Sequence, residues 1–130
     1  MDGQINYSFD TMAAVKPHVE GGKVYAVAQT RTKRSATYPD LPTVAESGYP
    51  SFEATTWYGV IGPAKMPADV VPRISRDINA AMAMPDVKER LAGVGAEDGR
   101  GTPQQFADFM RADRIKWARV VKEANVKVNT

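Results

Sequence analysis

Three short segments with the composition of β-strands, all in the first half of the chain, most constrain the fold. Residues 4–10 alternate polar and apolar side chains, which is the period-two pattern of a strand. Residues 23–30 place apolar side chains on both faces, as in a strand that is covered on two sides in an α/β sheet. Residues 55–61 are rich in β-branched and aromatic types, which favour strands. Such strands need partners on both sides, so the pattern predicts part of a larger α/β protein.

Helical patterns separate and follow these strands. Residues 11–20 predict a short helix, capped by Asp10 or Thr11 and ended by Gly21 and Gly22. A short helical turn is expected over residues 43–47, before Gly48.

A longer helix is predicted over residues 68–84, where apolar side chains recur at helical spacing. Because Pro72 is tolerated only in a first turn, the regular helix is expected to begin later than Ala68. Pro85 ends it, and Asp86 then caps a short helix through Val94.

The last helix has the clearest start signal. Thr102, Pro103 and Gln105 fit a capping box with proline at the first helical position. Asp113 lies on the apolar stripe of this helix, where we expect it to pair with Arg114 or Lys116.

Composition excludes several classes of function. The net charge of +2, from 17 basic and 15 acidic residues, is too small to indicate a nucleic-acid partner. Arg31, Lys33 and Arg34 form the densest basic run, which is interpreted as a solvated loop. The absence of cysteine excludes disulfides, thiolate catalysis and thiolate metal sites. The amino-terminal residues show neither the basic region nor the apolar run of an export signal.

No catalytic, metal or cofactor site is predicted. His18, the one histidine, is interpreted as structural or surface-exposed, because no Gly-x-Ser-x-Gly elbow accompanies it. The glycine pairs at 93/95 and 99/101 do not complete a phosphate-binding loop and are expected to be turns. Ligand spacing for a metal ion is also missing.

Taken together and in order, ten segments resemble the Bug-type receptors of the tripartite tricarboxylate transporters, which are solute-binding proteins. The segments that carry the resemblance are Phe9-Asp10, Pro17-His18, 22–28, 33–35, 39–50, 56–60, 62–64, 102–106, Lys116-Trp117 and 120–122. They cover essentially the whole chain. The turn at residues 62–67 departs from the family pattern, which puts only a surface turn in doubt.

The resemblance implies an α/β, type II periplasmic-binding-protein fold of two lobes around a ligand cleft. Family members are longer and carry an export signal, so the chain is expected to be a carboxy-terminal portion that lacks the earlier ligand-binding loops. Residues 1–22 would end the second lobe, residues 23–37 would form the crossing strand and hinge loop, and residues 38–130 would complete the first lobe. Unpaired strand edges further predict self-association as a homodimer.

The function implied is the capture of small carboxylates in the periplasm for the membrane subunits of a transporter, without a cofactor and without catalysis. The ligand is expected at the strand end Ser8, Phe9, Asp10 and Thr11, beside a helix start. Thr11 would donate to a carboxylate, whereas Asp10 would accept from a ligand amine or hydroxyl. Alternatively, Asp10 and Thr11 only cap the helix. Trp57 and Tyr58 are expected in the core rather than in the cleft.

Two other functions remain open at this point. The chain is either a self-associating fragment without ligand binding or a carboxylate-sensing regulatory domain, although no DNA-binding helix-turn-helix is fused to it.

Overall fold

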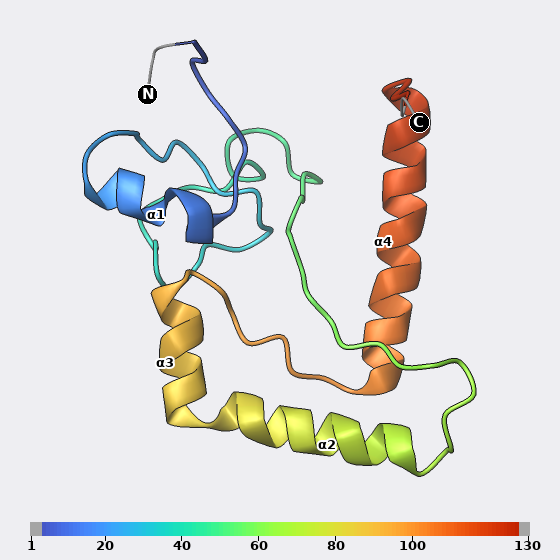
Figure 1. The fold of residues 1–130 in the computed structure, drawn as a ribbon. Helices are drawn as coiled ribbons and strands as arrows, with labels where there is room; N and C mark the ends of the chain where they lie inside the picture. The colour runs from blue at the N-terminus through green and yellow to red at the C-terminus, as the bar shows by residue number, and fades with distance from the viewer. Residues whose placement is uncertain (1–3, 128–130) are drawn as a thin grey trace. The chain divides into compact units, whose positions relative to one another are not determined.

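The computed structural model describes residues 4–127, and four helices lie in this part of the chain. Helix α1 spans Met12–Glu20, α2 spans Val70–Ala83, α3 spans Pro85–Gly93 and α4 spans Pro103–Glu123 (Figure 1). The chain packs as two compact units. The first contains the chain up to Ile61 together with Pro85–Asp98, and the second contains Gly62–Met84 and the chain from Gly99 onward. The predicted lobe boundaries stay a prediction.

The helices begin and end close to where the sequence signals place them. Pro72 lies in the first turn of α2, whose N-cap is Asp69, so the later start is confirmed. Helix α3 begins at Pro85 itself, one residue before the cap that was expected at Asp86. The capping box of α4 is present: Thr102 Oγ1 accepts from the Gln105 N–H at 3.1 Å, and Gln105 Oε1 accepts from the Thr102 N–H at 2.8 Å.

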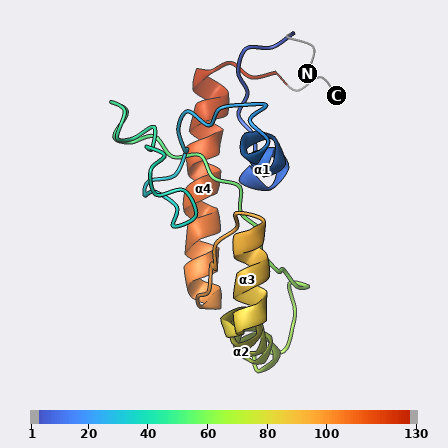
Figure 2. The same cartoon turned by 90° about the vertical axis from the view of Figure 1, so that its left-hand side faces the viewer.

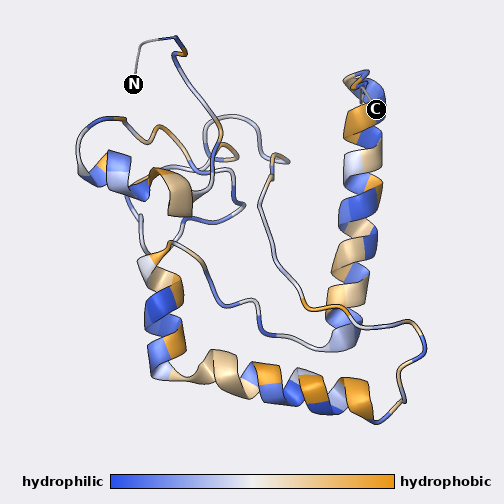
Figure 3. Ribbon diagram, in the orientation of Figure 1, coloured by the Kyte–Doolittle hydropathy of each residue, from blue (hydrophilic) through white to orange (hydrophobic). Residues whose placement is uncertain are grey.

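The second unit is held by polar contacts as well as by amphipathic helices. Hydrophobic and hydrophilic residues alternate along the ribbon of α2 (Figure 3), and α2 contacts α4. The Asn79 side chain donates to the carbonyl of Gly101 at 2.9 Å and accepts from its N–H at 3.2 Å. This pair ties the middle of α2 to the residue that precedes the α4 cap.

The predicted strands at 4–10, 23–30 and 55–61 are wrong for the described residues, where the only β pairing is one parallel bridge between Gln29 and Thr43. All three segments run without helix or strand (Figures 1 and 2). A strand exists only where its backbone N–H and C=O groups meet a neighbouring strand. The composition for strands is present, but apart from the bridge at Gln29 these segments have no strand partner within residues 4–127.

The apolar side chains are also uncovered. No hydrophobic residue among those described is buried, whereas Ser35 and Thr43 are, at 8% and 0% exposure. A fully buried Val, Leu, Ile or Phe side chain contributes about 1.5–3 kcal/mol, so these residues lack the stabilisation that an apolar core provides. The expectation that Trp57 and Tyr58 lie in the core is therefore wrong for this part of the chain, since Tyr58 is 91% exposed and Trp57 38%.

Candidate ligand-binding site

Residues Ser8, Phe9, Asp10 and Thr11 lead directly into the amino terminus of α1, where Thr11 is the N-cap residue. The Thr11 carbonyl accepts from the N–H groups of Ala14 and Val15 at 3.0 and 3.2 Å. Its side chain makes no capping hydrogen bond. Asp10 Oδ1 accepts from the Thr11 N–H at 2.7 Å. Since neither side chain bonds to an N–H inside the helix, side-chain capping does not account for these two residues.

The first turn of α1 leaves donors free for an anion. The N–H groups at a helix start have no acceptor within the helix, and of those in α1 only Ala14 and Val15 donate back to Thr11. Within residues 4–127, the N–H groups of Met12 and Ala13 have no backbone acceptor. Helix N-termini attract negative charge, so the arrangement suits a carboxylate.

The site is open to solvent. Ser8, Phe9, Asp10 and Thr11 are all exposed, with Phe9 at 75%. The Asp10 carboxylate next to the free donors repels an anion but attracts an amine or hydroxyl. The segment thus presents both hydrogen-bond donors and a carboxylate acceptor to solvent.

Helix α1 is anchored by contacts with the end of α3 in the same unit. Lys16 Nζ donates to the Gly93 carbonyl at 3.0 Å and lies 3.7 Å from Glu20 Oε1. Gly95 has φ +70°, and a Cβ at that position would lie 2.7 Å from Met12 Cγ. The close approach of residue 95 to Met12 constrains the position of the amino-terminal end of α1, which follows its N-cap residue Thr11.

A polar network organises the loop after residue 28, and the sequence analysis did not identify it. The Gln29 amide group donates to the carbonyls of Tyr38 and Leu41 at 2.9 and 2.7 Å, and its Oε1 accepts from the Ser35 N–H at 2.9 Å. The Gln29 backbone donates to the Pro42 carbonyl at 2.8 Å and accepts from the Val44 N–H at 2.9 Å. One glutamine thus shapes both ends of the loop.

Thr43 and Glu46 form a second capping box. Glu46 Oε2 accepts from the Thr43 N–H at 2.7 Å, and Thr43 Oγ1 accepts from the Glu46 N–H at 3.1 Å. The turn expected over 43–47 is confirmed. The Thr-x-x-Glu spacing is the signal that could have identified this pair. The bond from the Thr43 backbone, followed by the Arg34 guanidinium, lowers the pKa of Glu46.

The basic run lies in a solvent-exposed loop, as interpreted, but two of its three cations are paired with carboxylates. Arg34 Nε donates to Glu46, and Arg34 Nη1 donates to the Pro39 carbonyl at 3.0 Å. Arg31 donates through both terminal nitrogens to the Glu97 carboxylate. These hydrogen bonds lower the pKa of Glu97. The charges of Arg31 and Arg34 are thus paired with the carboxylates of Glu97 and Glu46, which lie too far along the chain for the local sequence to reveal them.

Other sequence expectations have mixed outcomes. Asp113 pairs with Lys116 as expected, with Lys116 Nζ 3.0 Å from Asp113 Oδ1. The same Nζ lies 5.3 Å from the centre of the Trp117 ring. His18 is exposed, which agrees with the surface reading.

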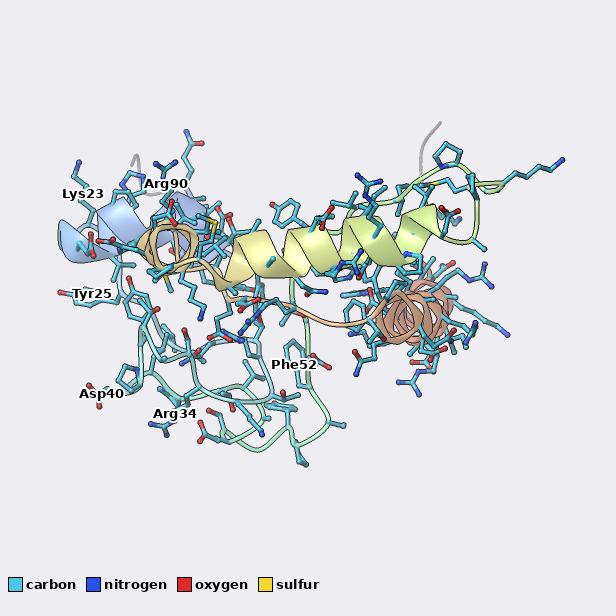
Figure 4. The ribbon with its side chains drawn as sticks, turned by 90° about the horizontal axis from the view of Figure 1, so that it is seen from below. Lys23, Tyr25, Arg34, Asp40, Phe52 and Arg90 are labelled. Atoms are coloured by element: carbon cyan, nitrogen blue, oxygen red, sulfur yellow. The ribbon has the colours of Figure 1, made fainter. Side chains whose placement is uncertain are left out.

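Two shallow hollows have linings that do not include residues 8–11. One is lined by residues 37–41 of the Gln29 loop, and another by Asn79, Arg100, Gly101 and Thr102 in the second unit. Figure 4 shows Arg34 and Asp40 at the edge of the loop. Within residues 4–127 no group of three metal-binding side chains comes together, and no helix is both long and apolar enough to cross a membrane.

Comparison with known proteins agrees with the resemblance found in the sequence. The profile of a family described as "Tripartite tricarboxylate transporter family receptor" matches residues 1–126. Protein BugT of Bordetella pertussis is 33% identical over 128 residues, which cover 98% of this chain and 39% of BugT. The chain therefore spans about two fifths of that relative.

Two solved structures are similar in shape. "R. palustris Rpa4515 with adipate" matches with a TM-score of 0.81 and 31% identity, covering 95% of this chain and 42% of that one. The structure of periplasmic binding protein BugD matches with a TM-score of 0.72 and 35% identity. This match covers 87% of this chain and 38% of the BugD chain. The fold is thus that of part of a periplasmic binding protein.

Proposed function

Because the chain belongs to the tripartite tricarboxylate transporter receptor family, we propose that it is part of an extracytoplasmic receptor that captures small carboxylates. The family is one of solute-binding receptors and not of enzymes. The observation that carries the ligand class is the free, exposed first turn of α1 in a chain whose structural relative was solved with adipate. Both point to an anion with a carboxylate head.

Ser8, Phe9, Asp10 and Thr11 are proposed as the contact segment. The Thr11 hydroxyl and the N–H groups of Met12 and Ala13 donate to one carboxylate, with the α1 dipole in favour. Phe9 provides an apolar surface for the carbon chain of the ligand. Since the segment forms only one wall, affinity for this chain alone is expected in the millimolar range, about −4 kcal/mol.

Placement in the periplasm and delivery to the membrane subunits of a transporter are proposed from the family. The carboxy-terminal origin of the chain, with residues 1–22 in one lobe and residues 38–130 in the other, belongs to the same proposal. Binding in the cleft then closes the lobes about the hinge loop at residues 23–37.

The test is an NMR titration of the chain with adipate, glutarate and citrate, following backbone amides. Saturable shifts at Thr11, Met12 and Ala13 are expected. Adipamide, which keeps the length and loses both charges, is the control and should leave these amides unchanged. Equal shifts with adipamide, or none with any carboxylate, contradict the proposal.

Variants sharpen this test. Thr11→Val removes the hydroxyl at constant shape and should weaken adipate binding, whereas Thr32→Val in the exposed loop should not. Asp10→Asn removes the repelling charge and should strengthen adipate binding while weakening that of glutamate, whose amine loses its acceptor. Identical changes in the affinity for adipate and glutamate would show that Asp10 does not contact the ligand.

The homodimer expected from the sequence stays a prediction. Light scattering at micromolar concentration tests it, and a clean monomer would contradict it.

A further inference from the structure

Helix α4 carries one isolated apolar side chain on the face opposite its apolar stripe. Ile115 lies nine residues after Phe106 and nine before Ala124, which begin and end that stripe. Nine residues make about two and a half turns at 3.6 residues per turn, so Ile115 lies on the other side of the helix. Ile115 is 64% exposed, whereas Trp117 and Val120 of the stripe are 41% and 37% exposed. A partner that covers the stripe therefore leaves Ile115 in solvent.

Cations flank Ile115 on this outer face. Arg111 lies one turn before it, Arg119 one turn after it, and Lys122 a further turn along. Side chains at this spacing share one face of a helix. All four residues are exposed. We call Arg111, Ile115, Arg119 and Lys122 the cationic face of α4.

The charges of this face are available to a partner. Arg111 Nη1 lies 2.7 Å from Asp108 Oδ1, with side chains 64% and 54% exposed. Arg119 Nε lies 3.9 Å from Glu123 Oε1, with side chains 71% and 69% exposed. Ion pairs as exposed as these contribute little to stability, so both guanidinium groups can exchange partners at small cost. Lys122 takes part in no ion pair among the described residues 4–127.

We propose that the cationic face of α4 is a docking surface for an acidic segment of another protein, which has carboxylates on both sides of an apolar side chain. The apolar side chain packs on Ile115, and the carboxylates accept hydrogen bonds from Arg111 and Arg119. Arginine suits this role because its guanidinium group binds a carboxylate at two points and is weakly hydrated. An apolar contact surrounded by polar groups that exclude water is the usual arrangement of a binding hot spot. The proposal does not depend on carboxylate binding at α1.

Charge complementarity favours such a partner over a second copy of the chain. In a two-fold interface through this face, each copy presents the same cations to the other, and like charges repel. A lipid surface fits less well, because helices that lie on membranes present a broad apolar face beside their cations. The cationic face offers Ile115 alone.

The test titrates the 130-residue chain with a synthetic peptide in which glutamates flank a central Leu-Phe pair on both sides. Backbone amide shifts are followed by NMR. Saturable shifts are expected at residues 111–122, and they should diminish as added salt screens the charges. One control peptide has glutamine in place of every glutamate, and another has serine in place of the Leu-Phe pair. Each should bind about tenfold more weakly.

An apolar variant tests the centre of the surface. Ile115→Ser should weaken peptide binding about tenfold, because it removes the central anchor. Ile5→Ser, at a residue that is 76% exposed in the first unit, is the matched control and should leave binding unchanged.

Charge reversal tests the flanking cations. Arg111→Glu combined with Arg119→Glu should abolish binding of the glutamate peptide and create binding of a peptide with lysines in the same places. Lys23→Glu combined with Lys65→Glu changes the net charge equally at exposed positions and should leave binding of the glutamate peptide unchanged. Circular dichroism checks that the helices are retained in each variant.

Three outcomes overturn the proposal. One is the absence of saturable shifts on α4, or an equal loss in Ile115→Ser and Ile5→Ser. Another is a set of shifts confined to Thr11 and Met12, which would assign the carboxylates of the peptide to the start of α1. The third is binding to phosphatidylglycerol vesicles without binding of the peptide, which would show that the partner is a lipid surface.

Discussion

Arg34 and Glu46 form a two-point contact in which Arg34 Nε lies 2.9 Å from Glu46 Oε2 and 3.1 Å from Oε1. The same Oε2 also accepts from the Thr43 N–H at 2.7 Å. Glu46 therefore joins the basic run to the turn at residues 43–47, and Thr43, the first residue of this turn, is fully buried. The contact closes a loop that has no apolar core of its own.

Replacing the charge of Glu46 should open this turn. Glu46→Gln keeps the shape but weakens acceptance from both Arg34 and the Thr43 N–H, because charged acceptors form the stronger bonds. We expect faster hydrogen exchange of the Thr43 and Glu46 amides. Glu89→Gln, on α3, is the matched control, and equal effects of the two variants would contradict a specific role for Glu46.

Gln29 should be more important than its polarity suggests. Gln29→Ala removes three side-chain hydrogen bonds, and at about 0.5–1.5 kcal/mol each we expect local stability to fall by about 2 kcal/mol. That corresponds to roughly thirtyfold faster exchange of the Ser35 and Val44 amides. Gln29→Glu keeps only the acceptor for Ser35 and should lie between the two, whereas an unchanged Ser35 amide would contradict the network.

Acid should release the link between Arg31 and Glu97. The pKa of Glu97 in the folded chain lies below its ordinary value of 4.5 because Arg31 donates to its carboxylate. A depressed carboxyl pKa stabilises the fold above the unfolded pKa, and this contribution is lost as the pH falls through the folded value. With Arg31 and Glu97 side chains 34% and 45% exposed, solvent screening keeps the effect modest.

An NMR titration of the Glu97 side-chain carboxyl measures this directly. Arg31→Gln should return its midpoint to the ordinary value, while Lys33→Gln, two residues away, should leave it depressed. A midpoint that is already ordinary in the unaltered chain would contradict the pairing.

The sequence predicted helices far better than strands, for a physical reason. The capping box at Thr102 and Gln105 contains both of its partners within four residues, so the pattern determines the structure. Residues 23–30 instead need a neighbouring strand, and only Gln29 finds one within the described chain. The strand-like composition of the segment was recognised correctly. Whether it forms a strand depends on a neighbouring strand, which the segment's own residues do not reveal.

The same difference between local and distant partners applies to the candidate site. The start of α1 beside Thr11 was predictable because capping residues and the following helix are adjacent. The contacts that hold α1 were not, since Lys16 meets Gly93, which is 77 residues away in the chain. Arg31 likewise finds Glu97 66 residues later.

The contact between Gly95 and Met12 gives the sharpest test of how α1 is held. Gly95→Ala has two costs: the left-handed backbone at φ +70° and a Cβ placed 2.7 Å from Met12 Cγ. Gly22→Ala carries only the first, because Gly22 has φ +66° and nothing within 4 Å of its Cβ position. The backbone cost is about 1–2 kcal/mol, so Gly95→Ala should increase amide exchange in α1 and at Ala96 beyond that backbone effect. Adding Met12→Ala removes the Cγ contact and leaves Cβ at 3.0 Å, so it should remove most of the excess and bring the loss close to that of Gly22→Ala. A double variant no better than Gly95→Ala alone would show that Met12 does not set the position of α1.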